Sequence, residues 1–138
     1  MTDTRMVELD REECYRLLGM VHLGRVAVYA PNWGHPVIRP VTFRFHENSV
    51  VFRTDRGSKF TALLLSERAA FEVDAIDQHS RTGWSVIVTG LVEEVDNAAE
   101  LHRLDRLGLE PWAPGDKPHW VRIRSETVSG RRIEIGSQ

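Results

Sequence analysis

The residues best suited to bind an anionic ligand lie in one short segment, residues 52–59. A predicted strand ends in this segment, a glycine-containing loop follows, and a helix is predicted to begin at about Ser58. The first turn of a helix presents free N–H groups and a partial positive charge, which stabilise a phosphate. Three basic and two hydroxyl side chains surround this turn: Arg53, Arg56, Lys59, Thr54 and Ser58. The segment therefore predicts a phosphate site, but the same residues also fit a simpler interpretation in which Ser58 only caps the helix and the charges face solvent.

A second candidate is the run Arg39, Pro40, Val41 and Thr42, which lies within a predicted strand. Proline has no N–H to donate to a β-ladder, so Pro40 places this strand at the edge of a sheet or at a bulge. Backbone groups left free there could bind the edge of a flat heteroaromatic ring. A plain edge strand without a ligand fits the residues as well.

Aromatic side chains in two further segments could contact a planar ligand. Trp84 and Ser85 follow Gly83 where a loop opens into a long predicted strand, and could line a pocket. Trp112 and Trp120 lie in and after a proline-rich loop. Each of these tryptophans could instead be a packing residue.

The residues give little indication of a metal site, a nucleophilic catalyst or a nucleotide-binding loop. The six histidines are scattered without paired metal-ligand spacing, and Cys14 is the single cysteine, so no metal site is expected. The nucleophile motif Gly-x-Ser-x-Gly and the nucleotide-binding motifs Gly-x-Gly-x-x-Gly and Gly-x-x-x-x-Gly-Lys-Ser/Thr are absent. Cys14 itself falls on the apolar stripe of a predicted helix, which favours a core position.

Composition limits the class of protein. The 138 residues predict one domain, residues 1–138, and the formal net charge of −2 disfavours a nucleic-acid partner. No apolar run approaches the ~18–20 residues of a membrane span. No leader pattern is recognisable at the start, and one cysteine does not indicate an oxidising compartment, so a cytoplasmic location is expected.

Hydrophobic periodicity and turn residues predict about seven strands and three short helices. Helices are expected over 10–20, 59–67 and 97–107, with Asp10 and Asn97 as the N-caps of the first and the third. Strands are expected over 25–29, 37–45, 50–54, 70–74, 84–95, 120–124 and 131–135. Most connections are too short for parallel crossovers, so we expect a mainly β, antiparallel barrel with peripheral helices. The strand at 84–95 is apolar on both faces, which predicts a central position or a subunit interface. The last two strands are expected to turn at Ser129 and Gly130.

Taken in order, several segments resemble the pyridoxamine-phosphate-oxidase-like family of flavin-binding split barrels. The matching segments are Leu23-Gly24-Arg25-Val26-Ala27, His35-Pro36-Val37-x-x-Pro40-Val41-x-Phe43, Phe52-Arg53-Thr54-x-x-Gly57-Ser58-Lys59, Phe71-Glu72-Val73-Asp74, Gly83-Trp84-Ser85-Val86-x-Val88-x-Gly90 and Val128-x-Gly130-Arg131. The resemblance runs from about residue 9 to 135. It implies a six- to seven-stranded antiparallel split barrel that forms a homodimer with two FMN sites at the dimer interface.

The resemblance also implies roles for individual residues. Thr54, Ser58 and Lys59 would hold the FMN phosphate, with Arg53 or Arg56 nearby. Arg39, Pro40, Val41 and Thr42 would run along the edge of the isoalloxazine ring. Trp84 and Ser85 would reach the flavin from the long strand, from the same or the other subunit.

The function implied is that of an FMN-dependent oxidoreductase acting on an unidentified small organic substrate. The chain lacks the C-terminal substrate-binding segment of true pyridoxamine-phosphate oxidases, so we do not expect that substrate. Some members of the family bind a deazaflavin or haem instead, and a carrier or sensor without turnover is a further alternative. The compact arrangement of Arg, Ser and Lys favours FMN, whose tail is a short monophosphate.

Overall fold

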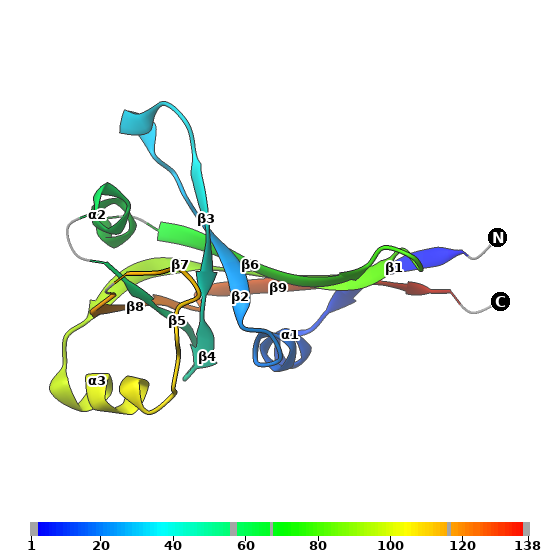
Figure 1. Ribbon diagram of the computed structural model, residues 1–138. Coiled ribbons are helices and arrows are strands. Elements are labelled where there is room, and N and C mark those ends of the chain that lie inside the picture. The colour runs from blue at the N-terminus through cyan, green and yellow to red at the C-terminus, as the bar shows by residue number, and fades with distance from the viewer. Residues whose placement is uncertain (1–2, 56–57, 67, 116, 137–138) are drawn as a thin grey trace.

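Two strands that follow each other in the sequence lie at opposite ends of the sheet, and this curls the sheet into a half-open barrel (Figure 1). The computed structural model describes residues 3–55, 58–66, 68–115 and 117–136. The hydrogen-bonded path through the barrel is β3 (Val37–Thr42), β2 (Leu23–Val28), β6 (Arg68–Asp77), β7 (Thr82–Val95), β8 (His119–Arg124), β5 (Ser49–Thr54) and β4 (Arg44–His46). Each neighbouring pair is antiparallel. The predicted antiparallel split barrel is confirmed.

Phe43 joins the two ends of this path. The prediction of one continuous strand over 37–45 was wrong, because the chain leaves the β2 ladder after Thr42 and enters the β5 ladder at Arg44. The Phe43 N–H donates to the backbone oxygen of His22 at 2.9 Å, outside either ladder. The Phe43 ring is fully buried and contacts the Phe71 ring edge-on, with 4.7 Å between the centroids. Burial of this ring holds the corner that closes the barrel.

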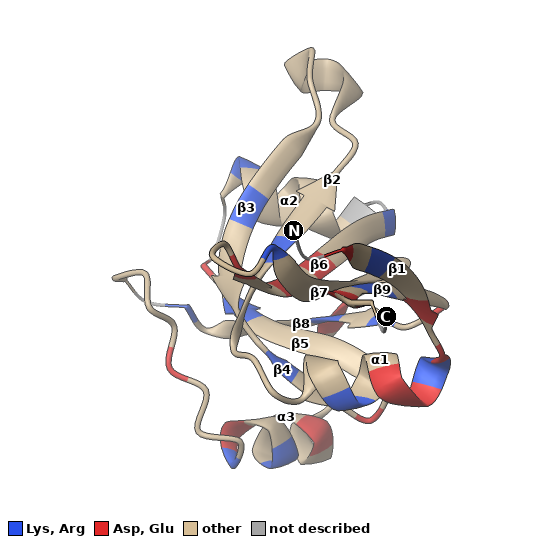
Figure 2. Cartoon of the chain, turned by 90° about the vertical axis from the view of Figure 1, so that its right-hand side faces the viewer, with Lys and Arg blue, Asp and Glu red and all other residues tan. Residues whose placement is uncertain are grey.

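Three α-helices cover the outside of the barrel, as predicted: α1 (Arg11–Leu18), α2 (Lys59–Ser66) and α3 (Ala98–Asp105). The predicted caps of α1 and α3 are confirmed, since the side chains of Asp10 and Asn97 accept from the N–H groups of Glu13 and Glu100 at 2.9 and 3.1 Å. Cys14 on α1 is fully buried, and this burial raises the pKa of its thiol. A short 3₁₀ turn, η1 (Pro31–Trp33), lies at the tip of the β2–β3 hairpin, and Figure 2 shows this tip projecting from the body without charged residues.

A long arm extends from the barrel and carries both ends of the chain (Figure 1). We define the arm as β1 (Thr4–Leu9), β9 (Thr127–Ile135) and the end of the β6–β7 hairpin, residues 74–84. β9 pairs with β7 on one side and with β1 on the other. β1 was not predicted, and β6 and β9 are longer than the strands predicted over 70–74 and 131–135.

Gly130 accounts for one of these errors. The turn predicted at Ser129 and Gly130 was wrong, because β9 already begins at Thr127 and Gly130 lies inside it. A Cβ atom at position 130 would lie 2.6 Å from the Cys14 sulfur. The glycine therefore allows α1 to pack closely on β9, whereas the sequence pattern indicated a turn.

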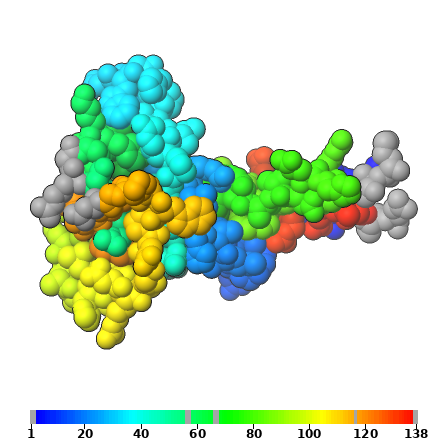
Figure 3. All heavy atoms as spheres, in the orientation of Figure 1, coloured from blue at the N-terminus to red at the C-terminus, as the bar shows by residue number. Residues whose placement is uncertain are grey.

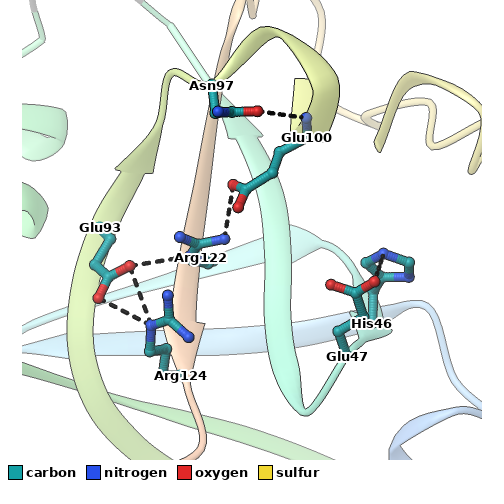
Figure 4. Close-up of polar contacts among 7 residues, drawn as sticks. All are labelled: His46, Glu47, Glu93, Asn97, Glu100, Arg122 and Arg124. Carbon is teal, nitrogen blue, oxygen red and sulfur yellow. Dashed lines mark hydrogen bonds and ion pairs between the residues drawn. The ribbon is translucent and has the colours of Figure 1, made fainter. Parts of the chain in front are cut away.

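A smaller apolar cluster lies between α3 and the β5–β8 pair, and contains Val51, Val95, Leu104, Leu109 and Trp120. Figure 4 shows a polar network beside it, in which Arg122 of β8 lies between two carboxylates. The Arg122 guanidinium donates to Glu93 and to Glu100, each at 3.0 Å. This network joins α3 to the sheet. None of the helices in the described part of the chain has the length and apolarity of a membrane span.

Candidate functional site

A cleft of about 570 Å³ opens at the end of the barrel where β3, β5 and α2 meet. The loop that precedes β8 forms its remaining wall, and Figure 3 shows this loop, in orange, lying across that face of the molecule. Seven of the site residues predicted from the sequence line the cleft: Arg39, Pro40, Val41, Thr42, Arg53, Thr54 and Ser58. The fold thus brings two segments together that lie more than ten residues apart in the chain.

The wall formed by β3 is an exposed sheet edge, as the sequence predicted from Pro40. β3 is the terminal strand of the path and pairs only with β2 in the described part of the chain. Pro40 therefore removes no ladder hydrogen bond that a second neighbour would need. Its position leaves the β3 backbone accessible along the cleft.

Ser58 caps α2 through its hydroxyl, and it also lines the cleft. Its Oγ accepts from the Thr61 N–H at 2.9 Å and donates to Thr61 Oγ1 at 2.9 Å. Thr61 Oγ1 in turn donates to Asp55, with its backbone and carboxylate oxygens at 3.2 and 3.3 Å. Thr61 is buried and was missed from the sequence, because a threonine within a helix gives no signal of a long-range contact.

The Thr54 hydroxyl differs from those of Ser58 and Thr61 in its hydrogen bonding. Its Oγ1 is buried at the end of β5, and among the residues that the structure describes it has no hydrogen-bond partner. A buried hydroxyl without a partner costs about 1–3 kcal/mol, and such groups in native proteins need an explanation. Because Thr54 lines the cleft, a ligand with a hydrogen-bond acceptor would supply the missing partner.

Arginine side chains give the cleft its charge. The Arg39 guanidinium lies over the Phe60 ring, 5.3 Å from the ring centroid. Arg53 donates from Nε to the backbone oxygen of Lys117 at 2.9 Å and lies 5.8 Å from the centroid of the Trp120 ring. Both guanidinium groups are thus held at the cleft by aromatic rings. Their N–H groups not used within the chain suit an anionic ligand.

Three predicted site residues, Lys59, Trp84 and Ser85, do not line the cleft. A fourth, Arg56, lies outside the described residues. Lys59 is the first residue of α2 and is exposed. Trp84 and Ser85 lie on β7 where it pairs with β6 and β9.

Trp84 lies outside the cleft, where the arm meets the main core. Its side chain is half-buried and packs against the main core, and it borders a shallow hollow of the arm together with Arg132 and Ile133. This chain by itself does not bring Trp84 and Ser85 to the cleft. Their contact with a flavin stays a prediction.

The structure adds Trp112 and Lys117 to the cleft. The sequence signalled both weakly, since Trp112 was a candidate cover for a planar ligand and the 18 basic residues include only two lysines. Trp120, the other tryptophan of this region, is buried and donates from Nε1 to Asp105 at 3.0 Å, so it is a packing residue.

A carboxylate pair, Glu72 and Asp74, lies on β6, which pairs with β2. The pKa of Glu72 is raised to about 7, first by burial and then by a hydrogen bond with Asp74, while the Arg25 guanidinium lowers it by less. The Arg25 guanidinium lies 3.3 Å from Glu72 and 3.4 Å from Asp74. The described ranges contain no group of three or more His, Cys, Asp or Glu side chains that could hold a metal ion.

Comparison with known proteins finds a family and similar structures for this chain. A family model described as pyridoxamine 5'-phosphate oxidase matches residues 10–132. The uncharacterized protein Rv0080 of Mycobacterium tuberculosis is 38% identical, and the alignment covers 96% of this chain and 89% of that protein. The solved structure of an FAD binding protein from Mycobacterium smegmatis has 34% identity and a TM-score of 0.78, covering 91% of this chain and 97% of that one. A conserved protein of unknown function from Corynebacterium diphtheriae has 32% identity and a TM-score of 0.75, covering 94% and 98%.

Proposed function

This chain belongs to the pyridoxamine 5'-phosphate oxidase family, and from that premise we propose that its cleft binds the flavin mononucleotide moiety that FMN and FAD share. The observation that carries the proposal is the buried Thr54 hydroxyl without a partner in the described part of the chain. A phosphate oxygen at the end of β5 would accept its hydrogen bond. Lys59 and Arg53 would balance the phosphate charge from α2 and β5.

The exposed edge of β3 supports the same proposal. Residues Arg39 to Thr42 line the cleft on a strand that has a free edge among the described residues. Backbone N–H and C=O groups on such an edge can bind the polar rim of a flat ring, and the adjoining side chains exclude water from it. A flavin supplies electron-transfer chemistry when bound, and the protein binds and orients it. We therefore propose an oxidoreductase that acts on a small organic substrate.

FMN and FAD differ in the group beyond the first phosphate. Thr54 and Arg53 of the cleft, with Lys59 on the exposed first turn of α2, provide for one phosphate and favour FMN, whereas the relative from Mycobacterium smegmatis is described as FAD binding. Both molecules present the same moiety to the cleft. The experiment below separates them by affinity.

The second part of the proposal is a homodimer that completes the site. Ile87 and Leu91 lie on the outer face of β7 and Ile76 on that of β6, and all three are exposed in the single chain. Large apolar side chains on one sheet face favour burial against another surface. A second copy of this chain would cover this face, and could supply Trp84 and Ser85 to the cleft of its partner.

Flavin binding is tested by titrating the purified chain with FMN, FAD and riboflavin and following the flavin fluorescence. We expect Thr54→Val to weaken FMN binding by about tenfold or more, because a hydrogen bond to a charged group contributes roughly 1.5–3 kcal/mol. Lys59→Ala should reduce the preference for FMN over riboflavin, which has no phosphate. Thr4→Val and Arg5→Ala on β1 are the matched controls and should leave both constants unchanged. Wild-type protein that binds neither FMN nor FAD would refute the proposal.

The dimer is tested by light scattering of the same preparation. We expect twice the monomer mass of 15.8 kDa at micromolar concentration. Ile87→Glu should give the monomer mass, because it places a charge on the apolar face. A wild-type mass of 15.8 kDa across that range would contradict the dimer and leave the flavin proposal standing.

A further inference from the structure

One wall of the cleft is a loop segment, residues 109–115, which we call the strap. It is anchored at its start by Leu109, which is buried in the cluster beneath α3. Pro111, Trp112 and Ala113 of the strap then line the cleft. Prolines at positions 111 and 114 restrict the strap backbone, since each fixes φ.

Hydrogen bonds hold this region to both other walls of the cleft. The Trp112 N–H donates to Thr42 Oγ1 on β3 at 3.1 Å. Just beyond the strap, the backbone oxygen of Lys117 accepts from Arg53 of β5 at 2.9 Å. The chain between α3 and β8 therefore spans the cleft from one predicted ligand-binding strand to the other.

The side chain of Trp112 is 70% exposed although it borders the cleft, so it stands at the mouth. Trp120, eight positions later, is 3% exposed and hydrogen-bonded to Asp105. An indole whose role is to pack within the chain would be buried and hydrogen-bonded, as that of Trp120 is. An exposed indole whose backbone is held in place at the mouth of a cleft offers a flat apolar face for stacking.

The charges around the mouth select among planar molecules. Among the residues that the structure describes, three cationic side chains line the cleft, Arg39, Arg53 and Lys117, against one carboxylate, Asp55. Asp55 also accepts a hydrogen bond from Thr61 and is in part satisfied within the chain. The cleft thus carries excess positive charge, which attracts an anion.

We propose that Trp112 is the specificity-determining residue of this site, and that it stacks on a planar aromatic substrate that carries a carboxylate. The proposal rests on the flavin-binding function proposed above, because the substrate enters over the occupied cleft. Stacking selects planar molecules, and Arg39 and Lys117, which are not assigned to the flavin phosphate, select anions. The hydrogen bond to Thr42 holds the Trp112 backbone in place at the mouth of the cleft.

The test measures binding of two carboxylates of similar size to the flavin-loaded protein by calorimetry. The first is 2-naphthoate, which is planar, and the second is decahydro-2-naphthoate, which is saturated and cannot stack. We expect wild-type protein to prefer 2-naphthoate by about tenfold, since an aromatic pair adds up to about 1.5 kcal/mol beyond area burial. Trp112→Leu should abolish the preference and Trp112→Phe should retain most of it. Trp33→Leu, on the β2–β3 turn, is the matched control.

The tether is tested on Thr42 with the same pair of ligands. Thr42→Ser keeps the acceptor for the Trp112 N–H and should keep the preference. Thr42→Val removes the acceptor and should reduce the preference severalfold.

The flavin affinity of each variant is measured separately to distinguish the possible failures. An unchanged preference in Trp112→Leu, or no binding of 2-naphthoate to wild-type protein that binds flavin normally, would overturn this inference alone. A loss of flavin affinity in Trp112→Leu equal to the loss of preference would also overturn it, because Trp112 would then cover the flavin. Wild-type protein that takes up no flavin would overturn both this inference and the proposed function.

Discussion

β6 runs through two regions of the molecule, the barrel and the arm, and its large apolar residues are buried in the first and exposed in the second. In the barrel Phe71 is fully buried beneath the cleft-lining strands, whereas in the arm Ile76 is 61% exposed. The cleft leaves a polar group, Thr54, without a partner in the described residues, and the arm leaves apolar surface uncovered. The two regions therefore need different partners. The Thr54 hydroxyl in the cleft lacks a hydrogen-bond acceptor among the described residues, and Ile76 in the arm lacks an apolar surface to pack against.

The largest expected effect is on the free energy of unfolding, and it compares one substitution of β6 in the barrel with one in the arm. Phe71→Ala should lower the free energy of unfolding by about 3–5 kcal/mol, because it empties the core at the ring contact with Phe43. Ile76→Ala should change it by about 0.5 kcal/mol or less at a concentration where the chain is monomeric. Urea denaturation measures both. A large loss for Ile76→Ala in the monomer would break the comparison, because it would mean that the arm has a core of its own.

A smaller effect is expected within the cleft. Thr61→Val should cost about 1–2 kcal/mol, since it removes the hydroxyl that bonds Ser58 and Asp55. Thr54→Val should leave stability unchanged or raise it by about 1 kcal/mol in the absence of ligand, because the hydroxyl it removes has no partner in the described structure. Thermal unfolding of the two variants provides the measurement. Equal losses would show that Thr54 is already satisfied within the chain.

The third prediction concerns pH and the carboxylates of β6. The pKa of Glu72 is raised to about 7 from the ordinary value of 4.5, mainly by burial and then by Asp74. The folded chain therefore binds this proton more tightly than the unfolded chain does. The stability that this proton contributes is complete below pH 4.5 and is lost as pH rises through 7.

Glu72→Gln keeps the group neutral and removes this dependence. We expect the variant to gain about 1 kcal/mol relative to wild type between pH 5 and pH 8, after allowance for solvent screening of a partly exposed group. Urea midpoints at the two pH values measure this gain. A gain of the opposite sign would mean that Arg25 outweighs burial and Asp74 at this carboxylate.

The smallest effect compares ion pairs of the two regions. Arg5 and Glu134 pair across β1 and β9 at 2.6 Å, with 59% of the Arg5 side chain exposed. Arg122 pairs with Glu100 at 3.0 Å with 21% of its side chain exposed. Double-mutant cycles should give a coupling of about 0.3 kcal/mol for the arm pair and about 1 kcal/mol for the pair at α3. The reverse order would show that the arm is the better ordered region.

The sequence predicted the local parts of the fold well. Asp10 and Asn97 were identified as caps because a cap acts on N–H groups only two or three residues away. Pro40 predicted an edge strand because the missing N–H belongs to the residue itself. Strand ends were less accurate, since β6 extends from Arg68 to Asp77 and its length depends on the partner β7.

The candidate site was predicted in part. The two segments 39–42 and 53–58 were selected by residue type, and the fold places seven of their residues around one cleft. Trp84 and Ser85 were selected in the same way but lie on β7 away from the cleft in this chain. Residue type indicates which chemistry a side chain can do, but it does not say which strand will lie beside it.

By itself the sequence determined the mainly β class, the helix caps, the edge position of Pro40 and the buried position of Cys14, because these depend on periodicity and on contacts within a few residues. Only the tertiary structure decided where Phe43 turns the chain from one end of the sheet to the other. It also decided that Gly130 lies under α1, that Thr54 lacks a partner among the described residues, and that Trp112 stands at the mouth of the cleft. Each of these depends on pairing between segments far apart in the chain, and such pairing is settled by the burial of the whole core.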